Sequence, residues 1–178
     1  GKVTSAGGVF EGAGSKKLII DDQSVISLGN NDLGSSNTLF GYQAGSTIAA
    51  GGNQNTVFGQ QALLYAGSAD TDGNVAVGFQ AIMGSSAGSV SDKAPRWNTA
   101  VGYQTGMDIT TAQFNTLLGI YAGTNLTTGG NNVVLGAYAG DAMTTTTKTV
   151  LIGQSAGGAI NHTDADGTVA IGYQTLLA

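Results

Sequence analysis

The chain has 178 residues, of which 41% are hydrophobic and only 10% are charged, and its net charge is −5. It contains no cysteine, which excludes disulfides and thiolate metal sites, and its six scattered Lys and Arg residues exclude the basic stripe that nucleic acid binding needs. No apolar run approaches the roughly 18 residues of a membrane-spanning helix, so membrane insertion is not expected.

The chain divides into two predicted parts. Residues 1–24 show no repeat and are expected to form a separate N-terminal segment, with one strand at Leu18–Ile20. Residues 25–178 form the repetitive part, and Val25–Gly29 resembles a degenerate first copy of its unit. The chain starts without Met and stops inside a repeat, so we expect a piece of a longer fibrous protein.

A short unit, first seen complete at Asn37–Gly45 (Asn-Thr-Leu-Phe-Gly-Tyr-Gln-Ala-Gly), occurs eight times with variations. A unit this short cannot bury a core alone and must stack on its neighbours, which predicts an all-β solenoid of about eight to nine coils. A β-sandwich also has short strands, but it does not require the same residue at the same place in each strand. The glycine that recurs in each unit, at intervals of 17 to 24 residues, is Gly41, Gly59, Gly78, Gly102, Gly119, Gly136, Gly153 and Gly172.

The positions around the repeat glycine predict a strand that is apolar on both faces. The residue before the glycine is always large and apolar, the residue three before it is Thr or Val, and the residue between them is Leu, Val or Ala. Side chains alternate along a strand, so one row packs inside the coil and the other needs a second cover, for which another chain is the best candidate. A rod of eight coils would be roughly 40 Å long with a thin core and open ends, which favours an obligate oligomer continuous with other domains.

Small and polar positions predict how successive coils are held together. The repeat glycine permits a sharp bend at the end of the strand. The Asn at the head of each unit is expected to bond to its own backbone and to the Asn of the next coil. Two residues after the repeat glycine, Gln43, Gln80, Gln104 and Gln174 predict a second ladder of the same kind.

The segment Asn98–Gln104 (Asn-Thr-Ala-Val-Gly-Tyr-Gln) resembles the head repeats of trimeric autotransporter adhesins, the YadA-like or Hep/Hag repeats. Its longer form, Asn-Thr-Ala-Val-Gly-Tyr-Gln-Ala-Gly, is also similar to repeats in bacteriophage tail fibres. The resemblance covers about residues 25–178. It implies a left-handed parallel β-roll with three chains around one axis, an intertwined or side-by-side homotrimer, and it says much less about a ligand.

Coil length distinguishes the two relatives. Adhesin heads usually keep a unit near fourteen residues, whereas the unit here is longer and the extra residues follow the strand, so that each coil extrudes a loop. We therefore expect a structural segment of a bacteriophage tail fibre or similar virion appendage, flanked by other fibre or virion domains, that presents loops to a bacterial surface. The alternative is the head of a trimeric autotransporter adhesin at the bacterial cell surface, binding host matrix or cells. An enzyme is not expected, because a glycanase needs two carboxylates across a groove and the acids here cluster in loop turns.

The longest loop, Gly84–Trp97, holds the only Trp, the only Pro and the only Arg. Trp97 is expected to stack on a sugar ring of a bacterial surface glycan, while Arg96 and Asp92 bond the sugar hydroxyls. In the alternative interpretation, Trp97 caps the apolar end of a coil directly ahead of Asn98.

Two similar acidic segments precede coils, one with Asp70 and Asp72 and the other with Asp164 and Asp166. Paired carboxylates at this spacing resemble the start of a calcium loop, but neither segment has the distal Glu that completes one. The alternative is a plain Asp-Gly turn. No other cofactor is expected, and the lone histidine, His162, is interpreted as a solvated loop residue.

Overall fold

The computed structural model describes residues 8–11, 17–20, 24–27, 36–161 and 165–177. This part of the chain is all-β, as predicted, apart from η1 (Val90–Asp92), a single 3₁₀ turn. It contains no helix long and apolar enough to cross a membrane. Near the N-terminus, β1 (Gly8–Glu11) and β2 (Lys17–Ile20) pair as an antiparallel two-stranded sheet, and β2 confirms the strand predicted at Leu18–Ile20.

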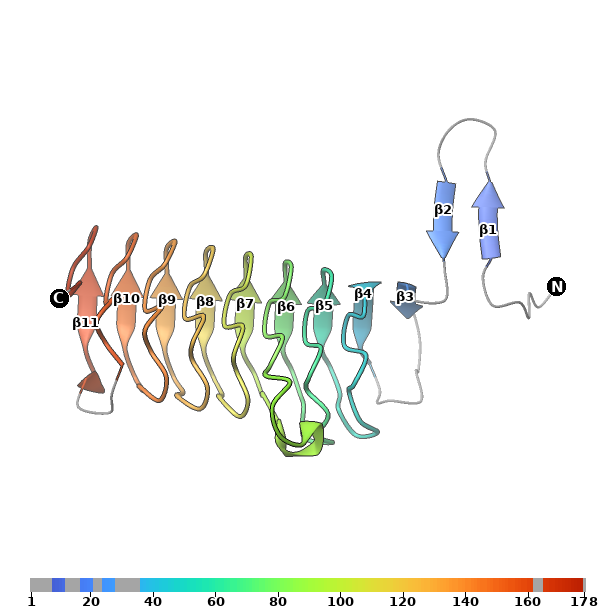
Figure 1. The fold of residues 1–178 in the computed structure, drawn as a ribbon, viewed down its shortest axis with the longest axis horizontal. Coiled ribbons are helices and arrows are strands. Elements are labelled where there is room, and N and C mark those ends of the chain that lie inside the picture. The colour runs from blue at the N-terminus through green and yellow to red at the C-terminus, as the bar shows by residue number, and fades with distance from the viewer. Residues whose placement is uncertain (1–7, 12–16, 21–23, 28–35, 162–164, 178) are drawn as a thin grey trace.

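Eight short strands stack in parallel into one sheet and form a β-solenoid of about seven turns (Figure 1). The pairing keeps one register throughout: Leu39 faces Val57, Val57 faces Ala76, and each later strand follows suit. Coils of different length therefore differ only in the segments that connect the strands. The strands are β4 (Thr38–Tyr42), β5 (Thr56–Phe58), β6 (Val75–Val77), β7 (Thr99–Val101), β8 (Thr116–Leu118), β9 (Val133–Leu135), β10 (Val150–Ile152) and β11 (Val169–Ile171).

A ninth strand, β3 (Ser24–Ser27), pairs with β4 in the antiparallel direction. The degenerate first coil predicted from Val25 is therefore wrong at this strand, because a coil of the solenoid would pair with β4 in parallel. The physical reason is that an edge strand offers its backbone groups to a neighbour of either direction. In this position β3 covers the edge of β4.

The repeat glycines set the bend at the end of each strand. Their φ angles lie between +128° and +145°, a range that residues with a Cβ rarely adopt. Space is a second reason for glycine: from Gly41 to Gly153, a Cβ at each repeat glycine would lie 2.2 to 2.6 Å from the carbonyl oxygen of the repeat glycine in the next coil. The coils can approach each other at this corner because the repeat glycine that faces the carbonyl oxygen of the next coil has no side chain.

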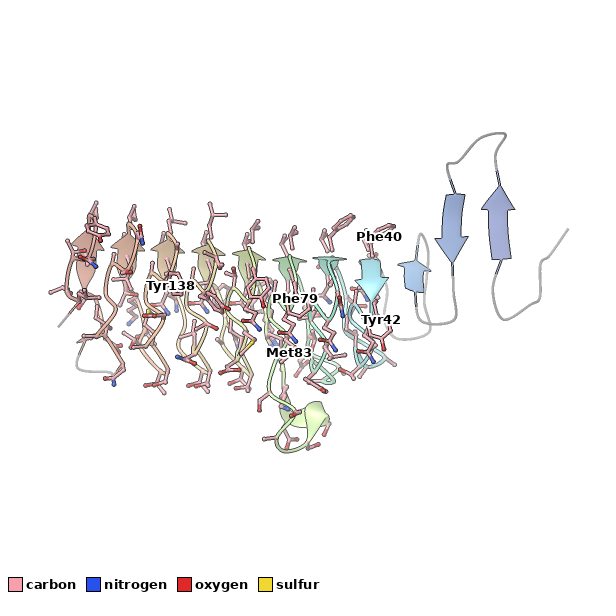
Figure 2. All side chains as sticks on the ribbon, turned by 45° about the horizontal axis from the view of Figure 1, so that its top comes forward. Phe40, Tyr42, Phe79, Met83 and Tyr138 are labelled. Carbon is pink, nitrogen blue, oxygen red and sulfur yellow. The ribbon has the colours of Figure 1, made fainter. Side chains whose placement is uncertain are left out.

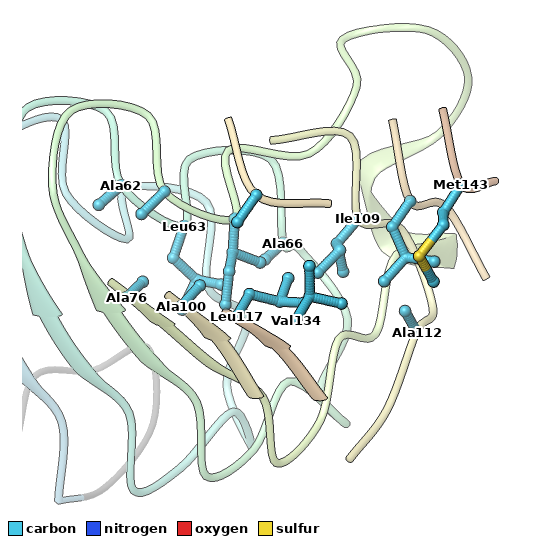
Figure 3. Close-up of a cluster of buried hydrophobic side chains, with 14 of the residues drawn as sticks. Ala62, Leu63, Ala66, Ala76, Ala100, Ile109, Ala112, Leu117, Val134 and Met143 are labelled. Carbon is cyan, nitrogen blue, oxygen red and sulfur yellow. The ribbon is translucent and has the colours of Figure 1, made fainter. Parts of the chain in front are cut away.

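The core fills the inside of the rod, and its side chains compensate one another in size (Figure 3). The residue two before each repeat glycine points inward and is buried, which identifies the inward row of the predicted two-sided strand. In the coil with the small Ala76, the position four after the repeat glycine holds the fully buried Ile82, whereas the coil with Leu117 has Gly123 there. The coil with Ala100 has Gly106 at this position, and Leu117 of the next coil fills the space, since a Cβ at Gly106 would lie 2.7 Å from the Leu117 side chain. A Cβ at Gly123 would lie 3.3 Å from the Leu117 side chain, so large residues at both positions would not fit together.

A ladder of buried asparagines, at the head of the coils with β4 to β9, confirms the predicted stacking. Each Asn side-chain NH₂ donates to the Oδ1 of the previous Asn over 2.9 to 3.1 Å, and its backbone N–H donates to the same oxygen. The NH₂ group also donates to a backbone carbonyl in a connecting segment, such as that of Ala112 for Asn98. Thr149 ends the ladder by donating its hydroxyl and its backbone N–H to Asn132. Each amide thereby ties its own coil to the previous strand and to a loop.

We predict that Asn98→Ala destabilises the rod by at least about 1–3 kcal/mol per chain. The change leaves the Oδ1 of Asn74 without one donor, and it leaves the Asn115 backbone N–H and the Ala112 carbonyl oxygen without their buried partner. Thermal or denaturant unfolding measures the loss. Asn98→Thr is the matched control, because Thr149 shows that a threonine keeps the bond to the previous coil; equal losses for both variants would contradict the role of the ladder.

We also predict that Gly119→Ala destabilises the rod by more than Gly88→Ala does. Both glycines have positive φ, so both variants incur backbone strain of about 1–3 kcal/mol. At Gly119 the new Cβ would also lie 2.6 Å from the Gly136 carbonyl oxygen, whereas at Gly88 it meets nothing within 4 Å. If the two variants unfold at the same temperature, the close approach of the coils contributes nothing to the requirement for glycine.

Candidate interaction surfaces

The outward side of the parallel sheet is an open apolar surface, which we call the sheet face (Figure 2). Its rings and aliphatic groups are well exposed, with 42% of Phe40, 53% of Phe58 and 49% of Leu118 accessible, and the two Phe rings stack at 4.7 Å. The inward row of the predicted two-sided strand is buried, and among the described residues nothing covers this outward row. The sheet face consists of Thr38, Phe40, Thr56, Phe58, Val75, Val77, Thr99, Val101, Thr116, Leu118, Val133, Leu135, Val150, Ile152, Val169 and Ile171.

The sheet face carries no charge from β4 to β11. Among the described residues from 36 to 177, every Asp, Lys and Arg lies in a segment that connects two strands. From the spacing of strands and residues, the face measures roughly 35 by 10 Å, on the order of 350 Å². Contiguous apolar patches of this size on a soluble chain are commonly interaction sites.

A second surface, which we call the ridge, follows the sheet face around the bend at the repeat glycine. Figure 2 shows Tyr42, Phe79 and Tyr138 along a side of the rod other than that of Phe40. The second of the two residues that follow each repeat glycine takes a left-handed conformation, with φ between +50° and +57°. The ridge comprises the two residues after each repeat glycine: Tyr42, Gln43, Gln60, Gln61, Phe79, Gln80, Tyr103, Gln104, Ile120, Tyr121, Ala137, Tyr138, Gln154, Ser155, Tyr173 and Gln174.

Side chains along the ridge bond and stack from coil to coil. The amides of Gln43, Gln61, Gln80 and Gln104 form a chain of hydrogen bonds of 3.0, 2.9 and 2.6 Å. This confirms the predicted ladder for three of its residues and adds Gln61; Gln174 bonds through its backbone N–H to the Gln154 carbonyl instead.

Aromatic rings of the ridge also contact one another from coil to coil. Phe79 stacks on Tyr103 at 5.2 Å, Tyr103 meets Tyr121 edge-on at 5.4 Å, and Tyr121 stacks on Tyr138 at 5.1 Å. Desolvation and the neighbouring Tyr103 raise the pKa of the Tyr121 hydroxyl. The ridge is therefore a continuous band of aromatic and amide groups, neutral at physiological pH.

The third surface surrounds Trp97, a half-exposed residue in a left-handed conformation outside the core. One face of its ring stacks on Phe114, with 4.8 Å between the ring centroids. On its other side lies Gly73, where an added Cβ would be 2.7 Å from the Trp97 Cδ1 atom. Beside these neighbours Trp97 keeps 46% of its surface exposed, and a ligand would contact this exposed part of the ring.

The structure brings Arg96 next to Trp97 and leaves Asp92 in other contacts. The Arg96 guanidinium forms an ion pair with Asp70 at 2.5 Å and donates from Nε to the Asp70 carbonyl oxygen. Its Cζ atom lies 6.0 Å from the centre of the Trp97 ring. Asp92, at the end of η1, accepts a hydrogen bond from Ser91 at 3.4 Å. A ligand at Arg96 would therefore have to share it with Asp70.

The loop that carries these residues extends beyond the outline of the other coils (Figure 1). Lys93, which the sequence analysis did not single out, anchors this loop. Lys93 is only 4% exposed; its ammonium group donates to the Ser85 carbonyl and lies over the Tyr65 ring at 5.7 Å. The backbone carbonyl oxygen of Lys93 accepts a hydrogen bond from the backbone N–H of Ser68 in the previous coil. The protruding loop thus has a fixed base.

The acidic segments show equivalent hydrogen bonds. Asp72 accepts the backbone N–H of Asn53 at 2.8 Å, and Asp166 accepts that of Thr147 at 2.7 Å, in each case from the previous coil.

Asp164 and His162 lie outside the described residues. Within the described part of the chain, no three His, Cys, Asp or Glu side chains gather as a metal site, and calcium binding stays a prediction.

Comparisons of this sequence and structure with protein-family models, curated proteins and solved structures found no match.

Proposed function

We propose that the chain is a structural segment of a bacteriophage tail fibre or similar virion appendage, in which three copies assemble as left-handed parallel β-rolls around one axis. The observation that carries the proposal is the uncharged sheet face, which runs the full length of the solenoid and is not covered by any part of the chain that the structure describes. A segment of a fibre needs such a continuous surface, because every coil must hold its counterparts in the other chains.

The rod suits a mechanical role. Successive coils are joined by parallel backbone pairing, by the buried asparagine ladder and by the ridge, and all three run along the rod axis. Bending or stretching the rod would have to break these rows together, which opposes local unfolding.

The sheet face alone provides limited association energy. Burying on the order of 350 Å² corresponds to about 9 kcal/mol at the usual value per unit of apolar area. Association costs an estimated 4–15 kcal/mol in lost translational and rotational freedom. A trimer therefore needs either further contact area or the support of flanking fibre domains.

Host attachment is the second part of the proposal. The Gly84–Trp97 loop would be displayed three times by a trimer, so that a weak contact with a bacterial surface glycan becomes firm attachment through avidity. The exposed part of Trp97 and the neighbouring Arg96 offer apolar contact and hydrogen-bond donors, two features typical of binding hot spots.

A bacterial adhesin head is the alternative function, and coil lengths of 17 to 24 residues favour the fibre over it. Electron microscopy with gold-labelled antibodies against the chain separates the two. Label on the tails of phage particles would support the proposal. Label on bacterial cells that carry no phage would overturn it in favour of the adhesin.

We predict that the chain has three times the mass of a 17.7 kDa protomer in light scattering, and that Leu118→Asp lowers this value to that of a monomer. The substitution would place one carboxylate per chain in an apolar interface, where its desolvation is costly. Because Leu118 is 49% exposed in the single chain, a true monomer should change in stability by no more than about 0.5 kcal/mol.

Thr145→Asp is the matched control for Leu118→Asp, since Thr145 is an exposed residue of a connecting segment. This control should keep the mass and the melting temperature of the unmodified chain. A folded monomer before any substitution would contradict the proposed trimer.

We predict that Trp97→Ala removes the binding of the fluorescently labelled trimer to host cells. Loss of the Trp97–Phe114 stack should reduce stability by about 0.5–1.5 kcal/mol beyond the buried area, so the trimer should persist. Phe114→Ala breaks the same stack without removing the Trp97 ring and serves as the control. If both variants bind cells like the unmodified chain, the receptor contact lies outside this loop.

A further inference from the structure

We propose that the ridge of one copy packs on the sheet face of the next copy, with the rods parallel and the same coils at the same height. The inference rests on the trimer proposed above and adds the second surface of its interface.

The two surfaces match in chemistry and in length. Both run from the coil of β4 to the coil of β11, and neither contains a charged residue. The described charges between residues 36 and 177 occupy other positions of the connecting segments. Contact between the ridge and the sheet face would therefore bury apolar and amide groups without burying a charged residue of either surface.

Symmetry requires a second surface. Identical copies that pack sheet face on sheet face through one two-fold axis form a dimer, whereas a closed ring of more copies needs a different surface toward each neighbour. The bend at the repeat glycine places the ridge beside the sheet face on every coil, so each copy carries both surfaces. A ring then buries two surfaces of each copy, on the order of 350 Å² each and about 700 Å² in total, whereas a standard two-partner interface buries roughly 800 Å² per partner.

The same symmetry fixes the register. A closed ring relates its copies by rotation without a shift along the axis, so each coil meets its own counterpart. The smallest residues directly before a repeat glycine, Val77 and Val101, belong to the coils that carry Phe79 and Tyr103 on the ridge. Packing in register therefore places these two rings over small side chains of the neighbour, which favours a well-filled contact at these coils, whereas the coil of β4 would set Tyr42 against the larger Phe40.

Engineered cysteines test the contact directly, because the natural chain contains none. Val101→Cys and Tyr103→Cys are produced as separate chains, refolded together, oxidised mildly and separated on a non-reducing gel. The expected result is a covalent dimer with one chain of each kind, which neither variant forms alone, since a disulfide needs Cβ atoms about 3.5–4.5 Å apart. Val101→Cys refolded with Tyr173→Cys is the matched control and should not link, because these coils are roughly 19 Å apart along the rod.

Each of the other outcomes would contradict one specific part of the proposal. If Val101→Cys links to itself, the sheet faces pack on one another and the ridge does not cover them. If the mixture does not link while light scattering still gives three times 17.7 kDa, the trimer stands and the ridge contact is wrong. Linkage in the control pair would refute the parallel register, and a monomer would remove both this inference and the proposed trimer.

Discussion

The close approach of successive repeat glycines holds the coils in one register, and the other regular features depend on it. At this corner the backbones lie so near that a Cβ would come within 2.2 to 2.6 Å of a carbonyl oxygen in the next coil. Because the backbones are held together at this bend, the residues two before the repeat glycine align inside the rod in all eight strands. The asparagine side chains then hydrogen-bond from coil to coil, and the outward residues form an unbroken face. Insertions have to leave the rod as loops, because a slip of one residue would turn the inward row outward.

Much of the solenoid could be predicted from the sequence, because equivalent positions of the repeat have the same structural environment in every coil and therefore hold similar residues. The asparagine ladder and most of the glutamine ladder are each signalled by one residue type recurring at one offset from the repeat glycine, and the two-sided strand is signalled by apolar residues at adjacent offsets. Gln61 was overlooked because it follows a second glutamine, Gln60, and only the backbone conformation distinguishes their positions.

The remaining features depend on contacts between residues that are not at equivalent positions of the repeat. The direction of β3 is settled by an edge that accepts either orientation, and the sequence of Ser24–Ser27 carries no direction. The Trp97 ring was expected to stack on a sugar, but Phe114 of the next coil takes one of its faces and Gly73 of the previous coil lies close to its Cδ1 atom. Nothing in the sequence marks Lys93 for burial, because its place over the Tyr65 ring follows from the path of one irregular loop.

Compensation of size distinguishes the inside of the rod from its outside. Inside, the small Ala76 is matched by the large Ile82 of the same coil, so the chain fills its own core. Outside, the row before the repeat glycine changes from Phe58 to Val77, and among the described residues no element packs on this row. Close packing rewards size matching only where surfaces touch. The residue directly after the repeat glycine changes in the opposite sense in these two coils, from Gln60 to Phe79, whereas the coil of β4 has a large residue at both positions, Phe40 and Tyr42.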